Sequence, residues 1–189
     1  MNKNIIILSC FIMLSTFYIG CIDDDIQNKE EDENEIDFNY NIEITPNFQE
    51  KCSIYVPIPL TESNNISKII DDIQITTGNG TINIIETKYG FALQIIINGK
   101  VLIESKGRSL DGYYNYLSMR NDTNINEPTT STQNWFYCDK PSENGSIQIS
   151  LICESRNMTN NKHMISSING EIKTNGWLIL IGNQTMEMA

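Results

Sequence analysis

The stretch Phe91-Ala92-Leu93-Gln94-Ile95-Ile96-Ile97-Asn98-Gly99-Lys100-Val101-Leu102-Ile103-Glu104 carries the strongest local structural signal in this sequence. Two apolar, β-branched runs flank Asn98-Gly99, and both of these residues tolerate the positive φ angles of a two-residue turn. The first run is almost continuously apolar, which is typical of a strand that is buried on both faces. The stretch therefore predicts a β-hairpin inside a predominantly β domain.

Alternation of apolar and polar residues extends this prediction along most of the chain. The positions from Ile36 to Ile44 alternate, and so do those from Cys52 to Val56, which is the period of a half-buried strand. Similar runs predict further strands at residues 81–87, 135–138, 147–153, 164–172 and 177–181. About eight or nine short strands favour a β-sandwich or a flattened barrel.

One segment has the period of a helix instead. Ile66, Ile69, Ile70 and Ile73 have the spacing i, i+3, i+4, i+7, which places them in one stripe on a helix. We therefore expect one short helix whose apolar stripe packs on the core, although β-branched residues make such a helix weak in isolation. The polar segment 121–134 predicts a long exposed loop.

The beginning of the chain predicts export. After Lys3, an apolar run of about fifteen residues suits the core of a signal peptide better than a bilayer span of roughly twenty. The run ends in Tyr18-Ile19-Gly20-Cys21. These residues resemble the lipobox of secreted lipoproteins of bacteria and some archaea, although Tyr18 stands where leucine is usual. The resemblance implies a signal peptide at residues 1–20 and a lipid on the sulfur of Cys21. An uncleaved signal anchor is the alternative.

An acidic segment follows the cysteine. Residues 22–37 contain nine acidic residues and one lysine, while the whole chain has a formal charge of −11. Because like charges repel and no apolar period is present, we expect residues 21–37 to form a disordered, lipid-anchored tether before a β-rich extracytoplasmic domain at 38–189. A calcium-collecting acidic tail is the alternative. The domain itself is weakly acidic and has no basic stripe, which argues against a nucleic-acid partner.

Residue types that support catalysis are sparse. A Ser–His–acid or Cys–His site would have to use the single histidine, His163, which the sequence places in a polar loop. Asp122 opens a segment similar to a calcium loop, but Glu127 and Gln133 stand where that loop needs Gly and a bidentate Glu. We therefore predict no catalytic residue, no metal site and no cofactor. Paired acids of a glycosidase type would have to come from Asp111, Asp139, Glu143 and Glu154, whose spacing gives no support.

Aromatic residues give a better indication of function. Tyr113, Tyr114, Tyr116 and Trp135 flank the long polar loop, and Trp177 follows a turn. Tyr and Trp are enriched at recognition surfaces, so the first four form a candidate recognition surface, but core packing is the favoured interpretation because aromatic residues also fill sandwich cores. Six sequons also suit an extracellular surface as candidate glycosylation sites; they begin at Asn65, Asn79, Asn121, Asn144, Asn157 and Asn183.

Three cysteines, Cys52, Cys138 and Cys153, follow the tether. Outside the cytoplasm thiols tend to pair, but three cannot all pair within one chain. Cys138 and Cys153 flank the turn sequence Asn144-Gly145, so a hairpin with a bulge near Pro141 would bring them together. We expect a Cys138–Cys153 disulfide. A bridge from Cys52 to either partner, or no bridge at all, remains open.

These features together predict a membrane-anchored lipoprotein on the extracytoplasmic face of the cell membrane, acting as a binding or structural surface module. The expected partners are the membrane, through the lipid anchor, and an unidentified protein or glycan at the cell surface. The alternatives are an envelope hydrolase and an accessory or inhibitor subunit of a neighbouring membrane protein.

Overall fold

The structure of the protein is a computed structural model that describes residues 36–61, 65–109, 114–121, 129–140, 143–158 and 161–188. These residues belong to one compact unit, Asn34–Ala189. The described part confirms the predicted mainly β fold. Its elements are β1 (Ile36–Pro46), β2 (Cys52–Pro57), β3 (Pro59–Thr61), a 3₁₀ turn η1 (Lys68–Ile70), β4 (Gln74–Thr77), β5 (Gly80–Thr87), β6 (Gly90–Ile97), β7 (Val101–Ser109), β8 (Tyr114–Leu117), β9 (Thr129–Asp139), β10 (Ile147–Asn157), β11 (Lys162–Ile172) and β12 (Gly176–Met188).

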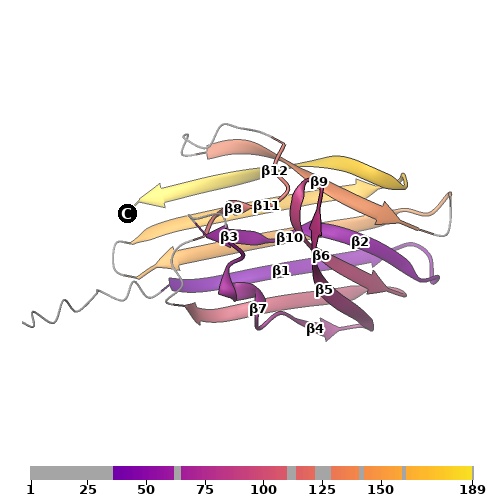
Figure 1. Ribbon diagram of the computed structural model, residues 1–189, viewed down its shortest axis with the longest axis horizontal. Helices are drawn as coiled ribbons and strands as arrows, with labels where there is room; N and C mark the ends of the chain where they lie inside the picture. Colours follow the sequence, from indigo (N-terminus) through magenta and orange to yellow (C-terminus); the bar gives the residue numbers. More distant parts are fainter. Residues whose placement is uncertain are drawn as a thin grey trace, which may run out of the picture. The chain divides into compact units, whose positions relative to one another are not determined.

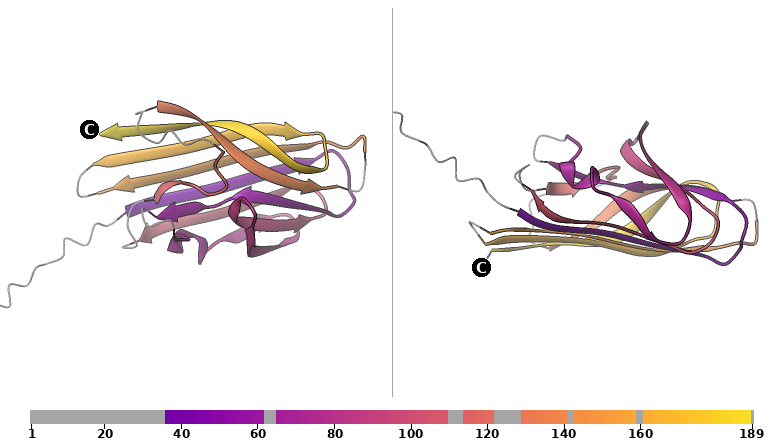
Figure 2. Two further views of the ribbon diagram at one scale, coloured as in Figure 1. Left: turned by 45° about the horizontal axis from the view of Figure 1, so that its top comes forward. Right: turned by 90° about the horizontal axis from the view of Figure 1, so that it is seen from below.

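Ten of the strands form one antiparallel sheet in the order β4-β7-β1-β10-β11-β12-β9-β2-β6-β5, while β3 and β8 form a separate pair (Figure 1). The two edge strands, β4 and β5, are consecutive in the chain, and the sheet nearly closes on itself. Seen from below in Figure 2, the long β1, β10, β11 and β12 form one layer, over which the shorter magenta strands lie. The predicted sandwich or flattened barrel is therefore confirmed.

The core lies between these two layers because the long strands alternate strictly. In β1 and β10 every second residue is buried, as in a strand with one face on the core and one in solvent. Tyr40 of β1 is fully buried, and its hydroxyl donates a 2.6 Å hydrogen bond to the backbone oxygen of Pro57 in β2. This bond satisfies the one polar atom of the buried Tyr40 side chain and links β1 in one layer to β2 in the other.

The predicted helix is wrong. Residues 68–70 form only a single 3₁₀ turn, and Ile66 makes a β-bridge to Leu60. The apolar stripe nevertheless packs on the core, since Ile70 is 2% exposed and Ile66 and Ile73 contact the buried cluster. Burial of these side chains is satisfied without a helix, which β-branched isoleucines do not favour.

The predicted hairpin at Asn98-Gly99 is also wrong, although both of its strands form. β6 pairs with β2 and β5, whereas β7 pairs with β1 and β4. Gly99 has the positive φ expected of a turn, but the turn carries the chain from one layer to the other. Because both strands direct apolar side chains into the core, they are stabilised in opposite layers rather than side by side.

The predicted Cys138–Cys153 disulfide is not formed. Cys52, Cys138 and Cys153 are buried, and within the described residues no disulfide joins any two of them. The expected hairpin does not exist because β11 and β12 lie between β10, which carries Cys153, and β9, which carries Cys138. Cys52 and Cys138 are closer neighbours, since Ile54 of β2 lies opposite Cys138, but even this pair is unbridged.

The predicted tether boundary differs slightly from the structure. Ile36 and Asp37, the last two residues of the predicted tether, already belong to β1, and Ile36 is 1% exposed. The rest of that segment and Cys21 lie outside the described residues. Within the described residues, no helix has the length and apolar character needed to cross a membrane.

Candidate ligand-binding face

Aromatic side chains gather on the solvent-facing side of the sheet, opposite the core. Tyr55 of β2 lies opposite Tyr137 of β9, which in turn lies opposite Trp177 of β12. The neighbours of Tyr55 in its strand, Ile54 and Val56, are fully buried. Because side chains alternate between the two faces of a strand, the three rings form one row across three strands on the outer face.

Two further rings complete this group. Trp135 of β9 is two residues from Tyr137 and therefore shares its face, and Tyr89 comes from the turn between β5 and β6. Tyr89 stacks on Trp135 with a centroid distance of 4.2 Å, and Tyr55 stacks on Tyr137 at 4.6 Å. Trp177 contacts both pairs, at 4.7 Å from Tyr89 and 5.3 Å from Tyr137. We call these five half-buried residues the aromatic cluster.

The turn between β5 and β6 holds Tyr89 over the sheet. The Thr87 hydroxyl accepts a hydrogen bond from the Tyr89 N–H (3.1 Å) and donates one to the Gly90 oxygen (2.7 Å). Gly90 has a φ of 112°, which a residue with a side chain rarely adopts. The ammonium group of Lys88 lies 4.7 Å from the Tyr89 ring centroid and 5.9 Å from that of Trp177, within cation–π range.

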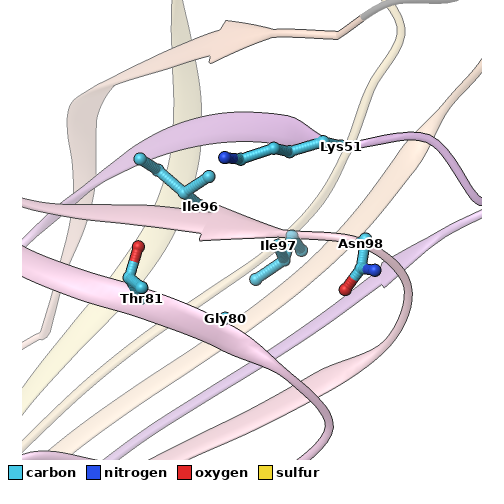
Figure 3. A pocket seen from close by; sticks show the side chains of 6 residues that line it. All are labelled: Lys51, Gly80, Thr81, Ile96, Ile97 and Asn98. Carbon is cyan, nitrogen blue, oxygen red and sulfur yellow. The ribbon is translucent and has the colours of Figure 1, made fainter.

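A groove runs beside the aromatic cluster, one step further along the strands. Its base is a cross-strand row of Asp139, Ser53, Ile96 and Thr81, on β9, β2, β6 and β5 respectively. Two adjoining hollows of about 370 and 330 Å³ share Ile96 and Lys51 in their linings. Figure 3 shows the Lys51 side chain reaching from the start of β2 towards Ile96. Ser53 is two residues before Tyr55 in β2, and Asp139 is two residues after Tyr137 in β9. The groove row therefore lies roughly 7 Å from the row of rings along the strands.

The polar groups of this region differ in how they are satisfied. The Ser53 hydroxyl oxygen is buried and has no hydrogen-bond partner among the described residues. Desolvation, and then the Asp139 carboxylate, raise the pKa of the Tyr137 hydroxyl. Beneath the groove, burial raises the pKa of the Cys52 thiol to about 11 and that of Cys138 to about 12. Both thiols therefore stay protonated at neutral pH and act as small apolar core groups.

Of the predicted recognition residues, the structure brings Trp135 into the cluster, together with Trp177. Tyr113 lies outside the described residues, and for Tyr114 and Tyr116 only the β8 backbone, paired with β3, is described. Three members, Tyr55, Tyr89 and Tyr137, were not predicted. The signal for the two strand residues was present, because Tyr55 lies on the polar phase of an alternating strand and Tyr137 follows Trp135 by two positions.

Five of the candidate glycosylation sites are exposed, namely Asn65, Asn79, Asn121, Asn144 and Asn183. Asn157 differs, because it ends β10 and is only 4% exposed. A glycan on this buried side chain would have to displace the residues packed over it, so we retain only the five exposed sequons as candidates.

Charged residues form a second arrangement, at the opposite end of the outer face. Arg108, Asp37, Arg156, His163 and Glu187 lie in one cross-strand row. His163 is therefore on strand β11, not in the predicted loop, and its Nε2 lies 2.8 Å from Glu154 Oε1. Such a row of mainly alternating charges is an ordinary stabilising feature of an exposed sheet face.

Asp139 and Glu154, two of the acids considered for catalysis, are not brought together, although Glu154 contacts His163. Asp139 follows Cys138, which lies opposite Gly176 at the start of β12. Glu154 lies opposite Ile165 of β11, which in turn lies opposite Thr185 near the end of β12. The two acids are therefore at opposite ends of the sheet. Asp111 and most of the calcium-like segment, residues 122–128, lie outside the described residues. Among the described side chains there is no group of three or more residues suited to hold a metal ion.

Comparison of the chain with protein-family models, curated proteins and solved structures finds no match.

Proposed function

We propose that this protein is a membrane-anchored, extracytoplasmic binding module, and that the aromatic cluster with its adjoining groove is its recognition face. The observation that carries the proposal is the placement of five Tyr and Trp rings on the solvent side of a sheet whose other side already has a full core. Aromatic side chains of this kind are enriched at the centres of recognition surfaces. A concave site beside them, with a few polar groups, is typical of ligand binding.

The position of the face supports an anchored module. β1 begins at Ile36 at one end of the sheet, whereas β9 ends and β2 begins at the other end, on the right in Figure 1; Asp139 is the last residue of β9, and Ser53 lies opposite it in register. A lipid on Cys21, followed by an acidic spacer, would attach the membrane to the end at which β1 begins. The recognition face would then be free for a partner at the cell surface.

Retention of envelope material tests the binding role. Residues 22–189 would be immobilised as wild type and as Tyr137→Ala, which removes the central ring of the row. We expect wild type to retain a component of solubilised envelope, and Tyr137→Ala to lose about tenfold or more of that affinity. Ile152→Ala is the matched control, because Ile152 is an exposed apolar residue of the outer face (39%) on the distant strand β10. Equal loss in both variants, or no retention by wild type, contradicts the proposal.

Mass spectrometry of the membrane fraction tests the anchor. We expect a protein that starts at a lipid-modified Cys21, and an unprocessed precursor for Cys21→Ser. A wild-type chain that keeps residues 1–20 and carries no lipid contradicts the anchor, while leaving the binding face as a separate question.

A further inference from the structure

We propose that the ligand of this face is an uncharged glycan chain, whose sugar rings pack on the aromatic cluster while neighbouring hydroxyl groups hydrogen-bond in the groove. This inference rests on the proposed binding function and specifies its ligand. It follows from three observations: an unsatisfied buried hydroxyl in the groove, the alternation of ring and polar rows, and a balance of charge.

The first observation is the Ser53 hydroxyl. Its oxygen is buried beside the groove and has no partner among the described residues, although buried polar groups are nearly always hydrogen-bonded. An unmade bond of this kind costs about 1–3 kcal/mol. The oxygen is covered in this conformation, so a ligand hydroxyl would reach it only after the residues over it move aside; it could then donate to this oxygen or accept from its O–H, which an apolar side chain of a protein partner cannot do.

The second observation is the order of side chains across the face. The row Trp177–Tyr137–Tyr55 continues onto Gln94 of β6 and Asn83 of β5, which are its register partners. On β9, β2, β6 and β5, the groove row lies two residues further along each strand. A sugar has an apolar face of C–H groups and a polar rim of hydroxyls, so rings flanked by amide and hydroxyl groups match both parts of it.

The third observation is electrostatic. The groove contains one ammonium, Lys51, and one carboxylate, Asp139, so it has no net charge of its own. Lys88, a further cation beside the aromatic cluster, already lies against the Tyr89 and Trp177 rings. Anionic ligands are usually held by several convergent basic groups, and the described part of this face does not provide them. A neutral, hydroxyl-rich ligand fits this balance best.

Selective destruction of the ligand tests the inference. Envelope material would be divided into three portions: untreated, digested exhaustively with protease, and oxidised with periodate, which cleaves carbon–carbon bonds between vicinal hydroxyls. Immobilised residues 22–189 contain the whole compact unit Asn34–Ala189 and would be offered each portion. We expect the untreated and protease-treated portions to be retained, and the periodate-treated portion to be lost.

The outcomes separate the two proposals. Retention that is lost with protease and survives periodate identifies a protein partner, which overturns the glycan inference and leaves the binding function standing. Absence of retention from every portion, untreated included, overturns the binding function and the glycan inference together.

A single hydroxyl provides the sharper variant. Ser53→Ala should weaken retention of the protease-treated portion by roughly two- to tenfold, because one hydrogen bond to the ligand is lost. The melting temperature of this variant should not fall, since the hydroxyl has no partner within the described protein. Ser167→Ala, on the same outer face but on β11, is the matched control and should bind as wild type. Unchanged binding by Ser53→Ala contradicts the placement of the glycan in the groove.

Discussion

Two buried hydroxyl oxygens without hydrogen-bond partners in the described part of the chain lower the stability of this domain. Besides Ser53 in the groove, the hydroxyl oxygen of Thr132 is buried without a partner among the described residues. The two differ in location, because Ser53 borders a groove while Thr132, 4% exposed, shares the inner face of β9 with the core residue Phe136. An unsatisfied group at the edge of a hollow can serve a ligand, whereas one on the inner face only lowers stability.

Thr132→Val should therefore stabilise the domain. Valine has nearly the same shape and removes a buried hydroxyl that has no hydrogen bond, so we expect the free energy of unfolding to rise by about 1 kcal/mol. Urea denaturation followed by circular dichroism measures this change. Thr185→Val, on the outer face of β12, controls for the general preference of strands for valine and should change stability by less than about 0.5 kcal/mol. A Thr132→Val variant less stable than wild type would contradict the assignment of an unpaired hydroxyl.

Buried thiols make stability dependent on alkaline pH. Folding raises the pKa of Cys52 from 9.0 to about 11 and that of Cys138 from 9.0 to about 12. Above pH 9 the unfolded chain therefore releases these protons before the folded domain does. The contribution to stability is complete below pH 9 and is lost as the pH rises through about 11 to 12.

We accordingly expect the melting temperature to fall steeply between pH 9 and 12, the interval set by these thiols. The double variant Cys52→Ala/Cys138→Ala should be less stable at neutral pH, yet show a shallower fall. The slope should not vanish, because burial also raises the pKa of Tyr40 well above its usual value. Identical slopes in the two proteins would show that these thiols do not titrate as described.

At the scale of elements, alternation predicted strands well but not their partners. The runs in β1, β2, β10 and β11 each have a buried phase that can be read from the residues themselves. Pairing depends instead on which distant strand completes the core. Asn98-Gly99 and Asn144-Gly145 are good turn sequences, yet the strands that flank each of them are not neighbours in the sheet. A local turn preference cannot compete with burial of whole apolar faces, which is worth roughly 1.5–3 kcal/mol for each large side chain.

The same contrast explains what could be predicted of the site. The sequence gives only a local indication for the two tryptophans, because Trp135 borders a polar segment and Trp177 follows a turn. Their assembly with Tyr55 and Tyr89 requires β2 to lie beside β9 and the β5–β6 turn to fold over the sheet. Neither arrangement has a local signal. The Ser53 groove likewise depends on four strands meeting in register.

Gly182 of β12 gives a prediction at this scale. A Cβ added there would overlap the backbone oxygen of Ser167 in β11, and it would lie 2.5 Å from Ile168 Cγ1. At Gly170 of β11 the added Cβ meets Leu180 Cδ2 at 2.9 Å, the flexible end of a side chain. We expect Gly182→Ala to cost about 2–4 kcal/mol and Gly170→Ala clearly less, because backbone cannot move aside as a side chain can. Equal losses in urea denaturation would contradict this packing between β11 and β12.

At the scale of the whole molecule, the two faces of the sheet differ in composition within the described part of the chain. The inner face holds the layers together through the isoleucine-rich core and the bond from Tyr40 to Pro57. The outer face carries a charge row at the end where β1 begins and the aromatic cluster with its groove towards the other end. Under the proposed function, recognition would be separated from stability, so ring-to-alanine changes on the outer face could be made without opening the core.

The two tryptophans of the chain, Trp135 and Trp177, both belong to the aromatic cluster. Tryptophan fluorescence, excited selectively over tyrosine, therefore reports on this face alone. The most direct test of our account is a titration of residues 22–189 with the protease-treated envelope fraction while this emission is followed. We predict a saturable change in intensity or wavelength that is preserved in Ile152→Ala and that in Tyr137→Ala requires about tenfold or more of the envelope fraction. Binding that is detected by retention but leaves the tryptophan emission unchanged would place the ligand elsewhere and contradict the account.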